Sequence, residues 1–393
     1  MAEKLKAIFV THEGFGSSIF QSQVIEHCES FAKLGYNFDI LTFEPWKKNR
    51  RLSEGNLSTY KKRGTTKVIL KRAMNIYFPF STINNLFLLV CEILRLFRKQ
   101  EYSFIHARAD YTAFLCVLLK PLHKLPVIWD CRGDLVDELE FTVDKFTWFK
   151  KIILNVLLVP RQRFIRSIAS RYSSSCITVS SALEKKLLSL NPDLLTHVIP
   201  CPVPGTKFYF SEERRHMARM DLGLCQDEQM FIYSGSMTGY QSLESFLWYY
   251  KKIINLPKSK ILIATIDRAK AEHVFRGLDT EKIMIKTVNY DQMNDLYCAA
   301  DFAIMVREPR PLNFVASPTK FGEYCLTGLT VIHNNSINQV SDYCDLLGNG
   351  LDLTIWPPVQ KTVKSRKKVA IKSRELYGRE YLNIVALECY RNL

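Results

Sequence analysis

Residues 317–332 read Ser-Pro-Thr-Lys-Phe-Gly-Glu-Tyr-Cys-Leu-Thr-Gly-Leu-Thr-Val-Ile, and this stretch is the most informative part of the chain. Ser317 is a good helix N-cap, and Pro318 is preorganised for the first helical position. We therefore predict a helix from Pro318 to about Thr327, with Gly328 as its C-cap. A short apolar run follows and reads as a buried strand. The stretch predicts one helix–strand unit of an α/β fold.

The same helix offers groups that can hold a phosphate and a sugar. Free N–H groups and the positive dipole end at a helix N-terminus attract phosphate, and Lys320 adds a cation there. Glu323 lies three residues on, on the same helical face, and could accept hydrogen bonds from a ribose. The alternative is an ordinary α/β unit in which Lys320 and Glu323 are surface residues.

Strand-like runs alternate with helical runs along the whole chain, which is typical of α/β architecture with parallel sheets. Helices are predicted at 19–34, at 86–97 and in the tail from residue 359. The predicted strands are residues 6–11, 38–43, 67–71, 104–107, 127–131, 176–179, 197–199, 230–233, 261–264, 283–286, 302–305 and 329–332.

The alternating pattern lapses between Cys201 and Gln229 into Pro, Gly and charged residues. At 393 residues the chain suits two domains rather than one core. We predict an N-terminal doubly wound domain at 1–205 and a linker region at 206–228. A second doubly wound domain follows at 229–360, and a helical tail at 361–393 could pack back on the N-terminal domain.

The 317–332 stretch resembles the nucleotide-sugar signature of GT-B-fold glycosyltransferases, specifically the retaining glycosyltransferase family four. The resemblance implies an α/β GT-B fold, with two Rossmann-like doubly wound domains facing each other across a cleft. It makes residues 1–205 the Rossmann-like acceptor-side domain and residues 229–360 the Rossmann-like nucleotide-sugar-binding domain. It also implies that the donor is a nucleotide diphosphate sugar and that Glu323 binds its ribose. The residues placed near the donor phosphates are Ser317, Pro318, Thr319 and Lys320.

The chain departs from the family pattern at two places. The family usually carries a second glutamate eight positions upstream, beside the donor sugar, and here that position is Val315. Asn313, or the backbone of residues 311–316, could replace it. Many members also have an Arg and a Lys after the strand that precedes Gly235. Here Ser236 and Gln241 stand in that region, so the positive charge would come from Lys320 with help from Arg307.

Loops after the N-terminal strands carry the other candidate residues. Gly14 and Gly16 lie in a loop that resembles the family's first loop, which reaches toward the donor phosphates and the acceptor; the alternative is an ordinary strand–helix turn. His106 resembles the family's cleft histidine, which contacts the donor sugar, although a histidine at a strand end is usually structural. Arg108 could bind phosphate as a planar fork.

Residues 129–134 read Trp-Asp-Cys-Arg-Gly-Asp at the end of the next strand, and related glycosyltransferases carry a similar stretch. Asp130, Arg132 and Asp134 could form a polar floor for the acceptor. They could instead form a structural ion pair that steadies the loop.

We expect no metal and no separate cofactor. No Asp-x-Asp motif is present, and no Cys/His cluster has zinc spacing. Eleven cysteines without paired spacing indicate reduced thiols in a cytosolic protein, and the N-terminus has no signal-peptide pattern.

The net charge of +15 leaves nucleic acid, an anionic membrane surface or phosphorylated substrates as partners. No nucleic-acid motif is visible. Residues 141–171 interleave basic and aromatic or aliphatic residues, which suits a membrane interface; the alternative is two domain helices with solvated charges. The candidate membrane residues are Trp148, Lys150, Lys151, Arg161 and Arg163.

The resemblance implies a retaining glycosyltransferase, and the residues add the expectation that it is metal-independent, cytoplasmic and peripheral on the membrane. It would move a sugar to a hydroxyl of a glycan acceptor, lipid-linked, in cell-surface polysaccharide synthesis. The alternative is a catalytically inactive GT-B subunit that binds a glycan or a partner. Val315 and the absence of the Arg/Lys pair favour this alternative.

Overall fold

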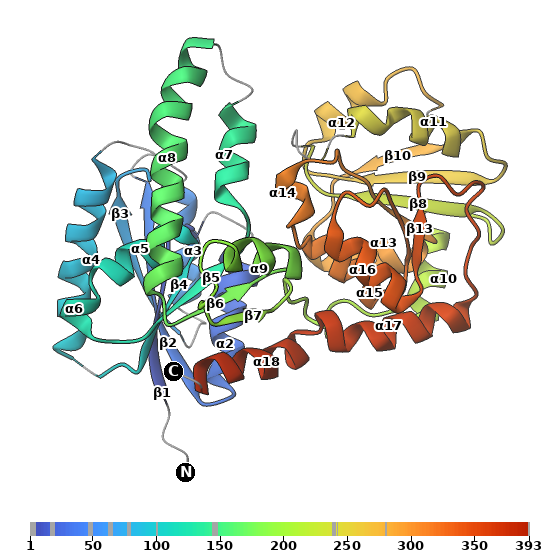
Figure 1. The fold of residues 1–393 in the computed structure, drawn as a ribbon. Coiled ribbons are helices and arrows are strands. Elements are labelled where there is room, and N and C mark those ends of the chain that lie inside the picture. Colours follow the sequence, from blue (N-terminus) through green and yellow to red (C-terminus); the bar gives the residue numbers. More distant parts are fainter. Residues whose placement is uncertain are drawn as a thin grey trace. The chain divides into compact units, whose positions relative to one another are not determined.

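The computed structural model describes residues 5–15, 20–45, 50–61, 66–76, 80–99, 101–143, 148–237, 241, 243–279 and 281–391, without the side chains of 50–53, 59, 61, 143, 148–151 and 153. The chain divides into two compact units. Unit 1 comprises Met1–Ile199 and Val385–Leu393, and unit 2 comprises Pro200–Ile384. Each unit has its own parallel sheet with helices on both faces (Figure 1).

The described strands of unit 1 form a seven-stranded sheet in the order β3-β2-β1-β4-β5-β6-β7, and all neighbours are parallel. The strand order reverses between β1 and β4, which is the topological switch point of a doubly wound sheet. The strands are β1 (Leu5–Thr11), β2 (Tyr36–Pro45), β3 (Lys67–Ala73), β4 (Phe104–Arg108), β5 (Val127–Cys131), β6 (Ser175–Thr178) and β7 (Thr196–Val198).

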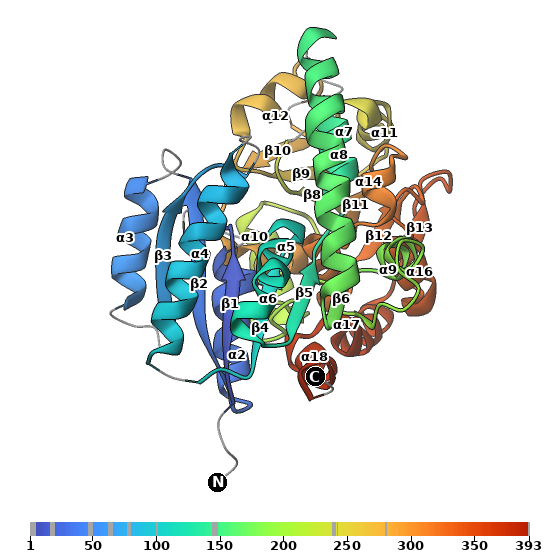
Figure 2. The ribbon, with the colours of Figure 1, turned by 60° about the vertical axis from the view of Figure 1, so that its left-hand side comes forward.

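Helices connect these strands, and α4, α5 and α8 cover one face of the sheet (Figures 1 and 2). A π-helical turn, η1 (Gln21–Ile25), continues directly into α2 (Glu26–Ala32), where the sequence predicted one helix over 19–34. The remaining helices are α3 (Arg50–Lys61), α4 (Ser81–Phe97), α5 (Asp110–Leu118), α6 (Lys120–His123), α7 (Leu135–Val143), α8 (Trp148–Tyr172) and α9 (Ser181–Leu188).

Unit 2 has a six-stranded parallel sheet among its described residues, in the order β10-β9-β8-β11-β12-β13. Here the switch point lies between β8 and β11. The strands are β8 (Gln229–Ser234), β9 (Ser259–Ala264), β10 (Ile283–Lys286), β11 (Phe302–Met305), β12 (Thr330–His333) and β13 (Gly350–Asp352). β13 was not predicted, because three residues with one apolar side chain carry too little pattern.

The helices of unit 2 begin with α10 (Glu212–Asp221), inside the segment where the sequence pattern lapses. They continue with η3 (Glu244–Phe246), α11 (Leu247–Ile254), α12 (Arg268–Val274), η4 (Tyr290–Gln292), α13 (Met293–Ala299), α14 (Pro311–Phe314), α15 (Thr319–Leu326), α16 (Asn338–Leu347), α17 (Val363–Tyr377) and α18 (Arg379–Arg391). The end of α18 belongs to unit 1.

The core of unit 2 shows why these strands read as apolar runs. Met230 and Ile232 of β8 belong to one hydrophobic cluster, and Phe231 and Tyr233 belong to another. Successive side chains of a strand point to opposite faces, so both faces of the sheet are covered. A parallel sheet buried on both faces needs apolar residues at nearly every strand position.

Candidate functional site

A pocket in unit 2 lies at the switch point of the six-stranded sheet, where β8 and β11 end. Ligands of doubly wound sheets bind outside the carboxyl ends of strands at such a point. The lining residues are Tyr233, Ser234, Gly235, Gln241, Ile304, Met305, Val306, Arg307 and Lys320.

Gly235 shapes the rim of this pocket. Its φ is +155°, outside the range that other residues adopt easily. A Cβ there would lie 2.8 Å from Oε1 of Gln241 and 3.2 Å from the Tyr233 hydroxyl. Only glycine therefore fits between these side chains, and it leaves backbone exposed at the end of β8.

Lys320 and Glu323 form an ion pair on the first turn of α15. The Lys320 ammonium is 2.9 Å from Oε2 of Glu323, at the i, i+3 spacing of neighbours on a helix. The Glu323 side chain is only 1% exposed, whereas Lys320 lines the pocket. Seen from the pocket, the Glu323 carboxylate thus lies behind the Lys320 ammonium.

The start of α15 differs from the prediction. The helix begins at Thr319, and Pro318 occupies the N-cap position in an extended conformation. Ser317 does not cap the helix: its hydroxyl accepts a hydrogen bond from the backbone N–H of Cys201, 3.2 Å away. The prediction was wrong by one residue because a partner distant in sequence engages the serine. Gly328 follows the helix with φ +67°, as the C-cap prediction required.

Arg307 is the second cation of the pocket, and Asn313 holds it. The Arg307 guanidinium donates to Oδ1 of Asn313 at 3.3 Å, and the Asn313 amide donates to the carbonyl of Glu308. Asn313 is fully buried and does not line the pocket. The structure thus places Asn313 as a support for Arg307.

The region that carries an Arg and a Lys in many related enzymes is neutral here. Gln241 donates to the Ser236 hydroxyl at 3.2 Å, and the Tyr233 hydroxyl donates to the Ser236 carbonyl at 2.8 Å. Ser236 and Gln241 therefore fix the loop after β8 rather than add charge to it.

In unit 1, the structure brings His106 and Asp130 together in the interior. Both side chains are fully buried, and Nε2 of His106 is 3.4 Å from Oδ2 of Asp130. The imidazole stacks on Phe9 at 4.4 Å, and its Nδ1 is 3.1 Å from the Tyr390 hydroxyl. Burial lowers the pKa of His106, so the ring is neutral near pH 7.

Two arginines neutralise Asp130. Nε of Arg132 is 2.8 Å from Oδ1, and Nη1 of Arg108 is 3.3 Å from Oδ2. Burial raises the pKa of Asp130, but Arg132, His106 and Arg108 outweigh it and hold the pKa well below its usual range. Arg108 also donates to Glu13 at 2.9 Å. Arg108 is thus engaged by two carboxylates of its own unit.

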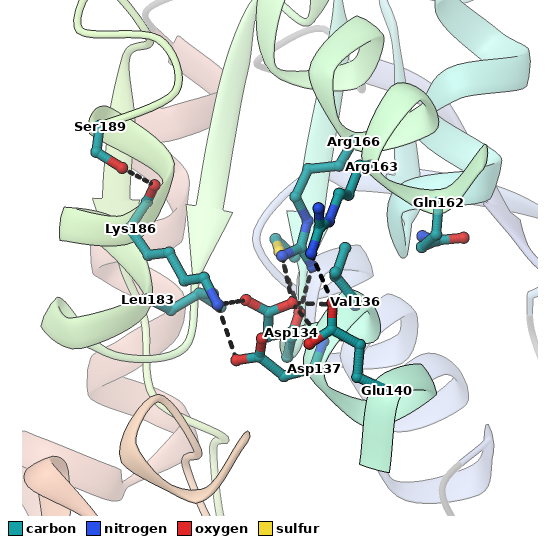
Figure 3. A network of polar contacts seen from close by, with 12 residues as sticks. Asp134, Val136, Asp137, Glu140, Gln162, Arg163, Arg166, Leu183, Lys186 and Ser189 are labelled. Atoms are coloured by element: carbon teal, nitrogen blue, oxygen red, sulfur yellow. Dashed lines mark hydrogen bonds and ion pairs between the residues drawn. The ribbon is translucent and has the colours of Figure 1, made fainter. Parts of the chain in front are cut away.

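Asp134 lies in a separate ion network (Figure 3). Its carboxylate accepts from the backbone N–H groups of Val136 at 3.0 Å and Asp137 at 3.1 Å, as an N-cap of α7 does. Arg166 and Lys186 each approach it to 2.5 Å. Burial raises the pKa of Asp134, but Arg166 and Lys186 outweigh this and lower it. The network supports the alternative that Asp134 steadies the loop.

The remaining predicted residues have these positions. A Cβ on Gly14 would overlap the carboxylate of Glu44, and Gly16 lies outside the described residues. Arg161 donates to the carbonyl of Ile76 at 2.8 Å and to the Thr82 hydroxyl at 2.8 Å, so its guanidinium is held within unit 1. Arg163 is 66% exposed and pairs with Glu140. The side chains of Trp148, Lys150 and Lys151 lie outside the described residues.

No group of three or more His, Cys, Asp or Glu residues in the described part is placed to hold a metal ion. None of the described helices combines the length and the apolar character that a membrane span requires.

Comparison with known proteins identifies the architecture. Residues 21–205 match the model of Glycosyltransferase Family 4. HepE of Anabaena, solved in complex with UDP, is similar to the chain with a TM-score of 0.71 at 12% identity, over 99% of this chain and 100% of that one. The chain has the GT-B glycosyltransferase fold. The resemblance and the fold class predicted from the sequence are confirmed.

Other GT-B structures match over nearly the whole chain. Sucrose-phosphate synthase of Thermosynechococcus elongatus has a TM-score of 0.67 at 14% identity, over 99% of this chain and 98% of that one. WaaG, a glycosyltransferase involved in lipopolysaccharide biosynthesis, has a TM-score of 0.62 at 10% identity, over 98% of each chain. No curated protein matches by sequence.

Sequence reasoning missed part of this GT-B pocket. The apolar residues 304–306 line it because they end β11, and the rule that ligands sit at strand carboxyl ends would have found them. Tyr297 donates a hydrogen bond to Glu323. No sequence motif marks this tyrosine, because its position beside Glu323 depends on how α13 packs on α15.

Proposed function

We propose that this protein is a glycosyltransferase that moves a sugar from a nucleotide diphosphate sugar to a hydroxyl of a glycan acceptor. The observation that carries the proposal is the unit 2 pocket at the switch point of the sheet, where Lys320 and Arg307 line the wall and Lys320 pairs with the buried Glu323. Cations suit a diphosphate and a carboxylate suits ribose hydroxyls. HepE, which has the same fold, has been solved with UDP and with UDP-glucose, which supports this class of donor.

Within the proposed reaction, the donor site supplies electrostatic stabilisation. Negative charge grows on the departing diphosphate, so Lys320, Arg307 and the first N–H groups of α15 would favour the transition state more than the ground state. We propose that these groups act without a metal or another cofactor. Attack of the acceptor on the leaving-group face would retain the anomeric configuration, as the resemblance to retaining enzymes implies.

We further propose that Asp130, Arg132 and Asp134 act on the acceptor side through the shape of the loop after β5. The burial of the two aspartates, and the ion pairs of Asp130 with Arg132 and of Asp134 with Arg166, favour support of this loop over direct contact with a sugar. His106, also buried, would act in the same indirect way.

We propose a cytoplasmic protein that contacts an anionic membrane through unit 1, with a lipid-linked acceptor. Val156, Leu157 and Phe164 of α8 are exposed, and so are Ile83 and Phe87 of α4, on the same face of the sheet. Exposed apolar side chains on basic helices suit an anionic interface. The similarity to WaaG supports a role in cell-surface polysaccharide synthesis.

Sedimentation with liposomes tests the membrane proposal. The triple change Val156→Ser, Leu157→Ser and Phe164→Ser should release the protein from acidic liposomes, and high salt should weaken binding of the unchanged protein. Ile371→Ser, on the exposed face of α17 in unit 2, is the control and should bind as before. A protein that stays in the supernatant with acidic liposomes would refute the membrane contact.

Calorimetry with UDP, GDP and ADP tests the donor site. One of them should bind, and Glu323→Gln should weaken that binding at least severalfold while the melting temperature of the apo-protein stays nearly unchanged. A ligand present at about a hundred times its Kd stabilises a protein by roughly 2.7 kcal/mol, which a thermal-shift measurement detects. Failure of all three to bind would overturn the proposed function.

One other function is favoured by a specific observation. Val315 is buried at the end of α14, where related enzymes carry a glutamate, and Gln241 leaves the loop after β8 neutral. A GT-B protein with these changes could bind glycans without transferring them. Hydrolysis of the sugar nucleotide in the absence of acceptor would separate the two, because an inactive binding subunit would leave the donor intact.

A further inference from the structure

The two oxygens of the Glu323 carboxylate have different surroundings. Oε2 accepts a hydrogen bond from the Tyr297 hydroxyl at 2.7 Å and lies 2.9 Å from the Lys320 ammonium. Oε1 is 3.3 Å from the same ammonium and has no other partner among the described residues. Tyr297 therefore holds one oxygen, and Lys320 alone covers the other.

Tyr297 is itself fixed on both sides. Its hydroxyl is 2.8 Å from Oγ of Ser234, which is 2.9 Å from the Tyr324 hydroxyl, so a chain of hydrogen bonds joins Glu323 to the last residue of β8. Its ring is fully buried and meets Tyr324 edge to face. Burial, with Glu323 beside it, raises the pKa of Tyr297 well above its usual value, so the hydroxyl stays a donor at neutral pH.

A buried arginine fixes the helix that carries Tyr297 to the helix that carries Glu323. The Arg366 guanidinium donates to the carbonyls of Tyr297 and Ala300, both at 2.6 Å, at the end of α13. It also donates to the carbonyl of Thr327, 2.9 Å away, just after α15. One side chain thus sets the spacing of the two helix ends.

The Lys320 ammonium cannot pair equally well with a bound diphosphate and with the Glu323 carboxylate. It lines the pocket, so a bound diphosphate, which carries more negative charge than one carboxylate, would attract the ammonium away from Glu323. A buried carboxylate without a hydrogen-bond donor is costly. After Lys320 has moved to the diphosphate, the Tyr297 hydroxyl is the hydrogen-bond donor that remains on the Glu323 carboxylate among the described residues.

We propose that Tyr297 is a positioning residue for the donor ribose: it holds Oε2 of Glu323 in place while Oε1 accepts a hydrogen bond from a ribose hydroxyl. This rests on the proposed function, because it requires a nucleotide in the pocket. Glu323 touches the ligand in this arrangement, and Tyr297 acts through Glu323.

The test compares nucleotides with and without ribose hydroxyls. UDP, GDP and ADP, and the 2′,3′-dideoxy form of each, are titrated by calorimetry into the full chain and into Tyr297→Phe. For the base that binds, Tyr297→Phe should lower affinity for the ribose form about tenfold, as expected for a weakened hydrogen bond to a charged group. Affinity for the dideoxy form should not change, because the phosphates and the base keep their contacts.

Tyr324→Phe is the matched control. Its ring is equally buried and its hydroxyl touches Ser234, but it does not touch Glu323. We expect it to change the affinities of ribose and dideoxy forms by the same factor. Tyr297→Phe in a Glu323→Gln background should add almost no further loss, since Tyr297 acts only through Glu323.

The outcomes separate the two levels of the proposal. Loss of ribose preference in Glu323→Gln but not in Tyr297→Phe would overturn the role of Tyr297 alone. Equal weakening of both ligand forms by Tyr297→Phe would show a merely structural role and would overturn it too. Ribose preference that survives Glu323→Gln, or failure of every nucleotide to bind, would overturn the donor site itself.

Discussion

Single side chains decide how the unit 2 pocket receives negative charge. Its loop after β8 is neutral, so Lys320 and Arg307 supply the positive charge among the described lining residues. The Lys320 ammonium pairs with Glu323, 2.9 Å away, and the Arg307 guanidinium donates a hydrogen bond to Asn313. The two cations are therefore expected to respond differently to substitution.

Lys320→Met should weaken binding of the nucleoside diphosphate roughly tenfold or more, because a charge-assisted hydrogen bond contributes about 1.5–3 kcal/mol. Calorimetry measures the effect, and Lys251→Met on the exposed face of α11 is the control, with no change expected. A silent Lys320→Met beside a damaging Arg307→Met would mean that Arg307, not Lys320, is the main cation at the diphosphate.

Gly235→Ala tests the rim of the pocket. The new Cβ would meet Gln241 at 2.8 Å in a backbone conformation with φ +155°, so we expect a lower melting temperature and weaker nucleotide binding. Gly277→Ala isolates the backbone strain, because Gly277 also has a positive φ, of +82°, but nothing lies within 4 Å of its Cβ position. If both variants bind nucleotide normally, the rim does not approach the ligand.

At the scale of the residue, the sequence predicted residue types better than contacts. Lys320, Arg307 and Gly235 line the pocket as their motif and position suggested. Ser317 was misassigned because its partner, Cys201, lies more than a hundred residues away. Tyr297 was not predicted for a similar reason, because no sequence pattern around a tyrosine shows which residue its hydroxyl contacts in the fold.

Helices α5, α7, α8 and α9 meet at one ion network in unit 1 (Figure 3). Arg166 of α8 is buried between Asp110, at 2.9 Å, and Asp134, at 2.5 Å. Lys186 of α9 pairs with Asp134 and, at 2.8 Å, with Asp137. Asp134 is the member that three elements share, so the arrangement of the helices depends on it.

Asp134→Ala should lower the free energy of unfolding by about 3–5 kcal/mol, because it removes one partner of a buried ion pair and leaves Arg166 undercompensated. Asp134→Asn should cost less, since an amide oxygen still caps α7. Chemical denaturation measures both, with Asp193→Ala, an exposed position, as the control. If Asp134→Ala has normal stability but no longer binds the acceptor, Asp134 contacts the acceptor directly, as the polar floor predicted from the sequence requires.

Among elements, the sequence predicted all of the described strands except β13, and most clearly those that are buried on both faces and therefore form apolar runs. Ends were less accurate. The helix predicted from Pro318 begins at Thr319, and the one predicted at 86–97 begins at Ser81. The first turn of α4, Ser-Thr-Ile-Asn, has one apolar residue among three polar ones and carries little apolar periodicity, so the start of α4 could not be predicted from it.

Across the whole molecule, buried histidines link stability to pH. Burial lowers the pKa of His12 to about 3, and both ring nitrogens lack a hydrogen-bond partner among the described residues. Burial also lowers the pKa values of His106, His123, His197 and His333. Because the unfolded chain binds these protons near pH 6.5 and the folded chain does not, stability falls as the pH falls below that value.

His12→Phe should remove part of this pH dependence. The ring packs edge to face on Tyr111 at 4.9 Å, and phenylalanine can keep that contact without titrating. Between pH 7 and pH 5, His12 alone should account for a loss of about 2 kcal/mol. Denaturation at the two pH values measures it, and His273→Phe on α12, an exposed position, is the control. The same loss in His12→Phe as in the unchanged protein would exclude His12 as a contributor.

The division into two units could be predicted from the sequence, because one α/β pattern stops and another starts near Cys201. The structure of the segment between the two patterns could not be predicted. The segment read as irregular contains α10, whose apolar residues are few and whose Arg219 is buried against the carbonyl of Ala299. A helix held by arginine–carbonyl contacts lacks the apolar stripe by which helices are recognised.

Tyr390 has a consequence for how the protein is made. Its ring stacks on Phe104 at 4.9 Å, and its hydroxyl lies 3.1 Å from both His106 and His27, inside unit 1. A ribosome completes residues 5–199 long before it reaches Tyr390, so these contacts of Tyr390 can form only after the intervening chain has been translated. Unit 2 comprises Pro200–Ile384, so its chain is complete before the last segment of unit 1, Val385–Leu393, is made.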